Sequence, residues 1–118
     1  MGRLGVLLFA SPIQHRTAET ALGLVEAAAR QGHSATVFLL GDAVYLASRA
    51  LADADPEGVV RRFEALPASV ELVSCTTCAR FRGLRDESLV RNARSGTLED
   101  LVDLIGSSDR FLSLTGDG

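Results

Sequence analysis

The sequence contains no lysine, only two cysteines and no long apolar run. All twelve basic residues are arginines, and an excess of acidic residues gives a formal net charge of −3. A negative balance argues against nucleic-acid binding, which normally needs a basic stripe on the surface. No apolar stretch reaches membrane-spanning length, and the first apolar run, Leu4 to Ala10, is too short for a secretion signal with its cleavage site. These absences predict a cytoplasmic protein with neither a membrane nor a nucleic acid as its partner.

The rest of the composition is that of an ordinary globular protein, with 47% hydrophobic and 23% charged residues. A length of 118 residues fits one domain. A domain of this size buries roughly two-thirds of its unfolded surface, so it needs neither a disulfide nor a metal to fold. Cysteines of the cytoplasm stay reduced. We therefore expect a single domain over residues 1–118 without a cofactor.

Short apolar runs alternate with helical patterns along the whole chain. Two apolar runs, at residues 4–9 and 35–40, are typical of strands covered on both faces. Residues 70–73, a short β-branched run, and residues 110–114 are expected to form two further strands. Residues 92–96 fit either a loop or a short strand. The alternation predicts an α/β fold, in which a mostly parallel sheet of four to five strands carries helices on both faces.

The helices between these runs have recognisable starts. Thr17 is expected to cap the first helix, and Asp42 a helix over about residues 43–52. Another helix is expected to start at Asp55-Pro56-Glu57. Thr97 and Asp100 form a capping box. The helix that follows this box has an apolar stripe, formed by Leu98, Leu101, Val102 and Ile105.

Ligands and reactive groups of such sheets gather beyond the carboxyl ends of the strands. Three loops meet that description, at residues 10–16, 41–42 and 74–83. The last of them holds both cysteines, Cys75 and Cys78, directly after an expected strand. At a helix start, unpaired backbone N–H groups favour a thiolate. We therefore expect an exposed Cys75 with a lowered pKa.

Four interpretations of the cysteine pair remain open from the residue types. Cys75 can accept sulfur as a persulfide, or Cys75 and Cys78 can cycle between dithiol and disulfide. The pair can also be half of a metal site, but only His15 and His33 are available as further ligands, so we expect no metal. Finally, both can be small buried residues without chemistry.

Five further residues are candidates for contacts with a substrate. His15 lies in the first loop, where it can act as a base or simply be solvated. Asp42 can steer a substrate or cap a helix, and Tyr45 can line the site or pack on a half-exposed face. Arg80 and Arg82 can hold an anionic sulfur donor or belong to a solvated surface.

Four stretches carry a resemblance to a known family, at residues 4–30, 32–45, 73–84 and 98–114. Within them, Gly41-Asp42-Ala43-Val44 and the combination of Cys75 with Arg82-Gly83 are the most specific elements. On these residues the chain resembles the DsrE/DsrF-like (TusD-like) sulfur-relay proteins over nearly its whole length.

The resemblance implies a flavodoxin-like three-layer sandwich that assembles into homotrimers or hexamers. It also implies that Cys75 carries sulfur as a persulfide, taken from a donor protein and passed to an acceptor protein. Cys78 would then resolve the persulfide by forming a disulfide. The alternatives are a non-catalytic assembly or regulatory module and a dithiol oxidoreductase. The apolar stretch 43–52 supports the expectation of an oligomer.

Overall fold

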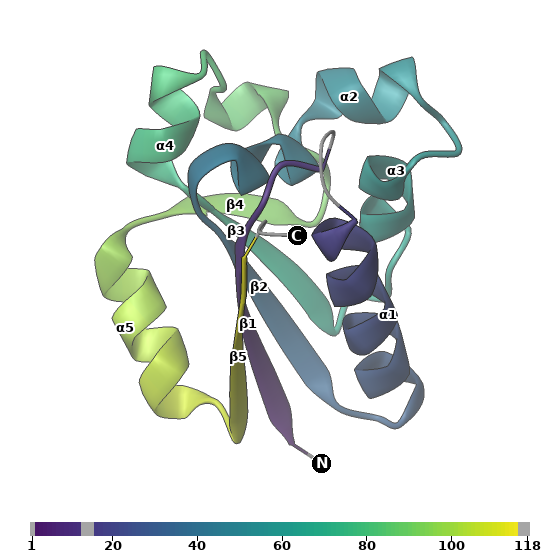
Figure 1. The fold of residues 1–118 in the computed structure, drawn as a ribbon, viewed down its shortest axis with the longest axis vertical. Coiled ribbons are helices and arrows are strands. Elements are labelled where there is room, and N and C mark those ends of the chain that lie inside the picture. The colour runs from purple at the N-terminus through teal and green to yellow at the C-terminus, as the bar shows by residue number, and fades with distance from the viewer. Residues whose placement is uncertain (1, 13–15, 116–118) are drawn as a thin grey trace.

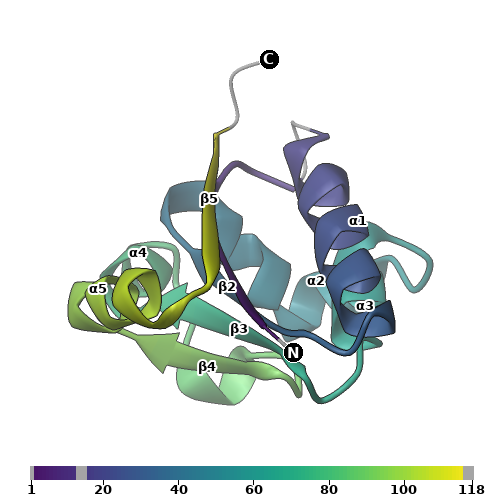
Figure 2. The same ribbon diagram turned by 90° about the horizontal axis from the view of Figure 1, so that it is seen from below.

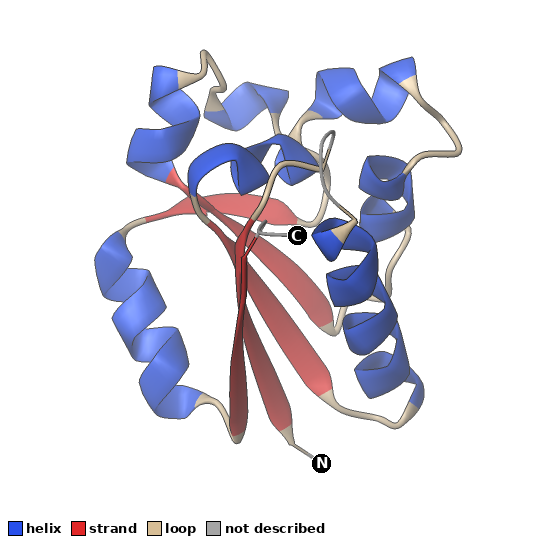
Figure 3. Cartoon of the chain, in the orientation of Figure 1, coloured by secondary structure: helices blue, strands red, loops and turns tan. Residues whose placement is uncertain are grey.

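A five-stranded parallel sheet forms the centre of the protein, as seen in a computed structural model that describes residues 2–12 and 16–115. Its strands follow the order β4-β3-β2-β1-β5, and every neighbouring pair is parallel (Figure 3). The strands are β1 (Arg3–Phe9), β2 (Ser34–Leu39), β3 (Val70–Cys75), β4 (Ala93–Gly96) and β5 (Arg110–Thr115).

Helices cover both faces of this sheet, which confirms the expected three-layer arrangement. Figures 1 and 2 show α1 (Thr17–Arg30) and α3 (Val59–Glu64) on one side and α5 (Leu98–Ser107) on the other. The short elements η1 (Gly41–Ala47), α2 (Arg49–Ala54) and α4 (Thr76–Phe81) lie beyond the carboxyl ends of the strands (Figure 1), and η2 is Asp86–Ser88.

The strand order explains this unequal distribution of helices. From β1 to β3 each strand is added on the same side of the one before it, so these right-handed crossovers place α1 and α3 on one face, whereas α4, which follows β3, lies beyond the strand ends (Figure 1). The chain then returns to the other edge of β1 to form β5. That reversed crossover places α5 alone on the opposite face.

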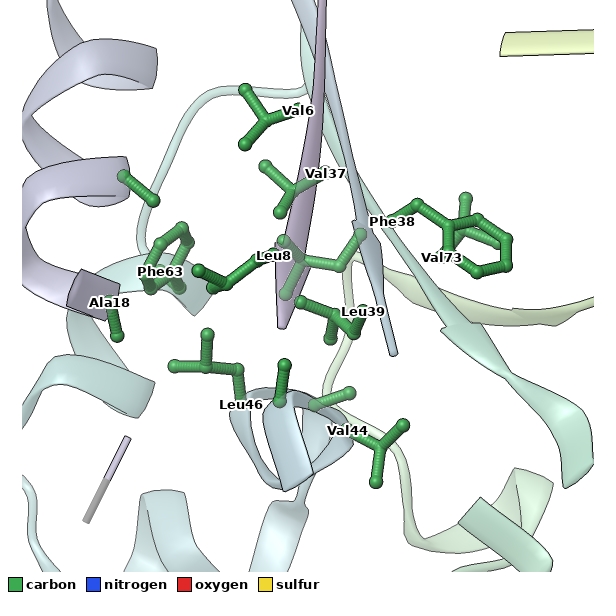
Figure 4. Close-up of a cluster of buried hydrophobic side chains, with 14 of the residues drawn as sticks. Val6, Leu8, Ala18, Val37, Phe38, Leu39, Val44, Leu46, Phe63 and Val73 are labelled. Carbon is green, nitrogen blue, oxygen red and sulfur yellow. The ribbon is translucent and has the colours of Figure 1, made fainter. Parts of the chain in front are cut away.

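The core consists of apolar side chains from both faces of the central strands. Val6, Val37 and Phe63 lie on one side of the strands, while Phe38 and Val73 lie on the other (Figure 4). The apolar runs that predicted β1 and β2 are therefore explained, because most of their side chains are buried on both faces, although Phe9 at the end of β1 is exposed.

The region between β2 and β3 differs from the expectation. The helix predicted over 43–52 is interrupted at Ser48, which separates η1 from α2 and accepts a hydrogen bond from the N–H of Leu51 at 3.3 Å. Most of its apolar residues are fully buried, namely Ala43, Val44, Leu46, Ala47 and Ala52, whereas Ala50 is exposed and Leu51 is half-buried. Most of the apolar side chains that supported the expectation of an oligomer therefore belong to the core of the monomer.

Helix boundaries account for the other corrections. Thr17 is the first residue of α1 rather than its cap, and Arg16 at the N-cap position makes no capping hydrogen bond with its side chain. Helix α3 begins after Gly58, later than the expected start at Asp55-Pro56-Glu57. The capping box of Thr97 and Asp100 is present, with the N–H of Thr97 donating to Asp100 at 2.7 Å. Residues 92–96, which were ambiguous, contain the edge strand β4.

The apolar stripe predicted on the last helix faces largely outward. Leu104 is the buried residue of α5, whereas Leu98, Val102 and Ile105 are exposed by 58%, 66% and 49%. Gly5 contributes to this orientation, because a Cβ there would overlap the Ser108 hydroxyl and lie 3.2 Å from Leu104. The missing side chain of Gly5 thus lets the end of α5 approach β1.

Candidate functional site

Cys75 is the last residue of β3 and the N-cap of α4, at the carboxyl edge of the sheet. It lies opposite Gly96 in the register of β3 with β4, and its side chain is 5% exposed. The strand is two residues longer than its apolar run predicted, since it continues through Ser74 into Cys75. The cysteine therefore belongs to the sheet rather than to an open loop.

This position changes the expected ionisation of the thiol. Burial raises the pKa of Cys75 above its ordinary value, and the neighbouring Cys78 thiol adds to that rise. Hydrogen bonding from the backbone N–H groups of Cys78 and Thr77 lowers the pKa, but it does not outweigh burial. The prediction of an exposed cysteine with a lowered pKa is therefore wrong, although the amide donors expected at the helix start are present.

Cys78 lies one helical turn after Cys75 and is half-buried against the core. Both thiols are free, and the effect of Cys78 on the ionisation of Cys75 shows that they are neighbours. The structure thus combines a buried sulfur at the strand end with a more accessible sulfur beside it.

Arg82 joins the cysteine segment to the loop that follows β2. Its Nε donates to Asp42 Oδ1 at 2.8 Å, and its Nη1 donates to the carbonyl oxygen of Cys78 at 2.9 Å. Two of the three predicted loops therefore converge. Asp42 makes this ion pair instead of capping a helix, because η1 already begins at Gly41 and has no side-chain cap. The pair fixes α4 relative to η1.

The other predicted contact residues do not all meet at this point. Arg80 lines a surface cavity of about 430 Å³ together with Thr76, Arg85 and Glu87, and neither cysteine belongs to that lining. Tyr45 is half-buried in η1, the element that contacts α4. His15 lies outside the described residues. The structure thus brings Asp42 and Arg82 to the cysteines and assigns Arg80 to a separate cavity.

Gly96 and Thr76 were not singled out in the sequence, yet they support the site directly. The Thr76 hydroxyl donates to the carbonyl oxygen of Gly96 at 2.9 Å, which ties the first residue of α4 to the end of β4. A Cβ on Gly96 would overlap the Val73 side chain and lie 3.0 Å from Asp100. A glycine in a short polar segment gives no sequence signal of this requirement.

We expect Gly96→Ala to lower the free energy of unfolding by about 1–3 kcal/mol, because the added methyl group must displace buried Val73. Urea denaturation of both proteins measures this loss. The matched control is Gly23→Ala in α1, where a Cβ meets no atom within 4 Å and alanine is the better helix former. Equal stability of Gly96→Ala and the wild type would contradict the tight packing described for this position.

No group of three or more histidine, cysteine or acidic residues in the described part of the chain is arranged to hold a metal ion. Within the same residues, no helix is both long enough and apolar enough to cross a membrane.

Comparison with known proteins identifies the family of this chain. The model of the DsrE/DsrF-like family matches residues 3–114, which is nearly the whole sequence. The chain belongs to the DsrE/DsrF-like family. This membership indicates a sulfur-relay kind of function, and it confirms the resemblance seen in the Cys75 and Arg82-Gly83 elements.

Relatives of this DsrE/DsrF-like chain occur in archaea and bacteria. It is 29% identical over 112 residues to the uncharacterized protein MJ0989 of Methanocaldococcus jannaschii, covering 92% of this chain and 96% of the relative. The crystal structure of the YchN protein of E. coli is similar with a TM-score of 0.84 and 25% identity, covering 96% and 99% of the two chains.

A second solved structure supports the fold alone. The protein of unknown function MTH1491 from Methanobacterium thermoautotrophicum has a TM-score of 0.64 and 13% identity, covering 95% of this chain and 99% of its own. The two chains therefore share their fold, although only 13% of the compared residues are identical.

Proposed function

We propose that the protein carries sulfane sulfur as a persulfide on Cys75 and passes it to the thiol of an acceptor protein. The observation that supports this proposal most is the position of Cys75. It ends a central parallel strand, and its sulfur accepts hydrogen bonds from the backbone N–H groups of Thr77 and Cys78. A second free thiol, that of Cys78, lies one helical turn away. This arrangement occurs in a chain of the DsrE/DsrF-like family.

Loading is a thiol exchange. The Cys75 thiol first gives up its proton, and the thiolate attacks the outer sulfur of a donor persulfide. The sulfur–sulfur bond of the donor breaks, and the donor leaves as a thiolate, which takes up the proton that Cys75 released. In delivery, an acceptor thiolate attacks the outer sulfur on Cys75, and the Cys75 thiolate is released. Each step makes one sulfur–sulfur bond and breaks one, so neither step needs an external oxidant or reductant.

Burial of Cys75 fits a carrier better than a general oxidoreductase. The raised pKa keeps the resting thiol protonated, which slows its exchange with thiols in solution. A persulfide is a stronger acid than a thiol, so the loaded group gives up its proton more readily. The amide N–H groups of Thr77 and Cys78 are placed to stabilise the resulting anion.

The charged residues around α4 have separate roles in this proposal. Arg82 is a positioning residue, since its guanidinium is occupied by Asp42 and by the Cys78 carbonyl group. Arg80 has no ion-pair partner in the described residues and remains available to an anionic donor. Tyr45 and His15 remain proposed substrate contacts.

We also propose that the protein works as a homotrimer or hexamer with separate donor and acceptor proteins.

Intact-mass spectrometry after brief exposure to a low-molecular-weight persulfide tests this function. We expect the wild type and Cys78→Ser to gain the mass of one sulfur atom, and Cys75→Ser to gain none. Added acceptor thiol should remove the extra mass. A gain that survives in Cys75→Ser and vanishes in Cys78→Ser would reverse the roles, and no gain in any protein would favour a non-catalytic module.

A dithiol oxidoreductase is the second candidate, favoured by the mutual influence of the two free thiols. In that case Cys78 attacks the inner sulfur of the Cys75 persulfide, which forms the Cys75–Cys78 disulfide and releases hydrogen sulfide. Equilibration with glutathione buffers distinguishes the two candidates. A disulfide that forms reversibly near cytosolic potentials would support the oxidoreductase, whereas a dithiol that stays reduced there supports the carrier.

A further inference from the structure

A cavity of about 430 Å³ lies beside the cysteine segment, between α4, η2 and β4. Part of its lining is apolar and packs with the core, since Ala79 is buried and Leu84 and Leu89 are half-buried. The lining also holds four charged side chains, two of each sign: Arg80, Arg85, Asp86 and Glu87. A cavity of this size, with an apolar part and a few polar groups, is typical of a site for a small molecule.

The four charged side chains of this cavity do not neutralise one another. All four are exposed, and none of them forms an ion pair within the described part of the chain. Asp86 accepts a hydrogen bond from the Ser95 hydroxyl, which leaves its second carboxylate oxygen available. Opposite charges that share a cavity without pairing are available to a ligand that carries both signs.

The backbone that carries three of these charges is fixed in position. The N–H of Arg85 donates to the Ser88 hydroxyl at 2.8 Å, and this hydroxyl donates back to the carbonyl oxygen of Arg85 at 2.6 Å. Two residues further on, the N–H of Val90 donates to the carbonyl oxygen of Ala47 at 2.8 Å, which attaches the segment to η1. A ligand therefore meets a largely ordered backbone, and this lowers the entropic cost of binding.

The cavity and the two thiols lie on adjoining sides of α4. Thr76 and Ala79 line the cavity, and each directly follows one of the two cysteines. Successive residues of a helix are rotated by about 100° around its axis. A ligand in the cavity therefore lies next to the helix that carries both thiols, although neither thiol belongs to the lining.

We propose that this cavity binds a low-molecular-weight thiol with an amino-acid headgroup. Its carboxylate pairs with the two arginines, whose guanidinium groups match the geometry of a carboxylate. Its ammonium group pairs with the two acidic side chains.

This binding has a consequence that rests on the proposed function. The persulfide of such a thiol is then a small-molecule donor that loads Cys75 in addition to a donor protein. The sulfur–sulfur bond of the donor breaks as a new one forms on Cys75, and the free thiol leaves, so the step needs no further reactant.

Isothermal titration calorimetry with reduced glutathione as the probe tests the binding. N-acetylation of the probe removes its ammonium charge, and esterification removes its carboxylates. Each change should raise the dissociation constant about tenfold or more, because charged hydrogen bonds are lost. Arg85→Gln and Glu87→Gln should each have the same effect. The matched controls are Arg62→Gln and Glu57→Gln, exposed positions on and before α3 that lie outside the cavity lining, and they should leave binding unchanged.

Loading of Cys75, followed by intact mass, gives a second readout. The wild type should load faster from glutathione persulfide than from its N-acetylated, esterified derivative, and Arg85→Gln should lose this preference. Absence of glutathione binding, or binding that ignores both the charges of the probe and the two cavity variants, would overturn the proposal. Failure to load from either persulfide would overturn the carrier function instead, and the calorimetry would still decide whether the cavity binds the thiol.

Discussion

Replacing Phe63 with alanine is expected to lower the free energy of unfolding by about 3–5 kcal/mol. Phe63 is fully buried, and it packs between α1 and the strands on the side of Val6 and Val37 (Figure 4). Truncation removes apolar burial and leaves a cavity that the surrounding sheet can fill only in part. Urea denaturation followed by circular dichroism measures the difference.

The chain offers a matched control for this change. Phe81→Ala removes the same atoms from an 84% exposed position, so it should alter the free energy of unfolding by less than about 0.5 kcal/mol in a dilute, monomeric sample. Equal losses in the two variants would contradict the burial that distinguishes these phenylalanines.

Glu64→Gln is expected to have the second-largest effect on stability. The buried Glu64 carboxylate binds Arg49 at 2.7 Å and Arg61 at 2.6 Å, and it accepts a hydrogen bond from the N–H of Arg91 at 3.3 Å. These contacts join α2, α3 and the segment before β4. Removing the charge should cost about 2–3 kcal/mol, somewhat less than a fully buried pair, because both guanidinium groups retain access to water.

Glu71→Gln is the control for this prediction. Glu71 forms an ion pair with Arg94 at 3.0 Å, but both side chains are well exposed, so its loss should cost less than about 1 kcal/mol. Thermal and urea unfolding of the two variants would show whether burial separates them. A loss in Glu71→Gln as large as that in Glu64→Gln would contradict this ranking.

The Glu64 contacts also predict how stability depends on pH. Burial raises the pKa of Glu64, but the Arg91 N–H and the guanidinium groups of Arg49 and Arg61 outweigh it and hold the pKa below its ordinary value. The group therefore stabilises the fold above the ordinary carboxyl pKa, and this contribution is lost as the pH falls through the lowered value. In Glu64→Gln this part of the acid dependence should be missing. An unchanged profile of unfolding free energy against pH would contradict the assignment.

The sequence predicted β1 and β2 because most of their residues are buried on both faces and therefore read as apolar runs. It could not predict the burial of Cys75, since that depends on β4. The β4 segment, Ala93–Gly96, contains arginine, serine and glycine and has no apolar pattern of its own. Pairing of Cys75 with Gly96 nevertheless extends β3 by one residue beyond Ser74, so that Cys75 is part of the sheet and is buried.

Contacts between distant segments also decide the geometry of the candidate site, and local sequence patterns do not predict such contacts. The Arg82–Asp42 ion pair joins residues 40 positions apart, and local signals at Asp42 favoured a helix cap instead. The apolar positions of α5 were recognised, but the face that meets the sheet is decided by Leu104 and by the space at Gly5. Local patterns thus located the elements, while tertiary packing decided the exposure and charge of the groups that matter for function.

The central claim is that sulfane sulfur is carried on Cys75. Trypsin releases one peptide, Phe63 to Arg80, that contains both cysteines, and fragmentation between Thr76 and Thr77 separates them. Tandem mass spectrometry of this peptide, after wild-type protein is loaded with a persulfide donor and alkylated, locates the extra sulfur. We predict that it is found on the fragment that carries Cys75. Sulfur found on the Cys78 fragment alone, or on neither, would contradict the account.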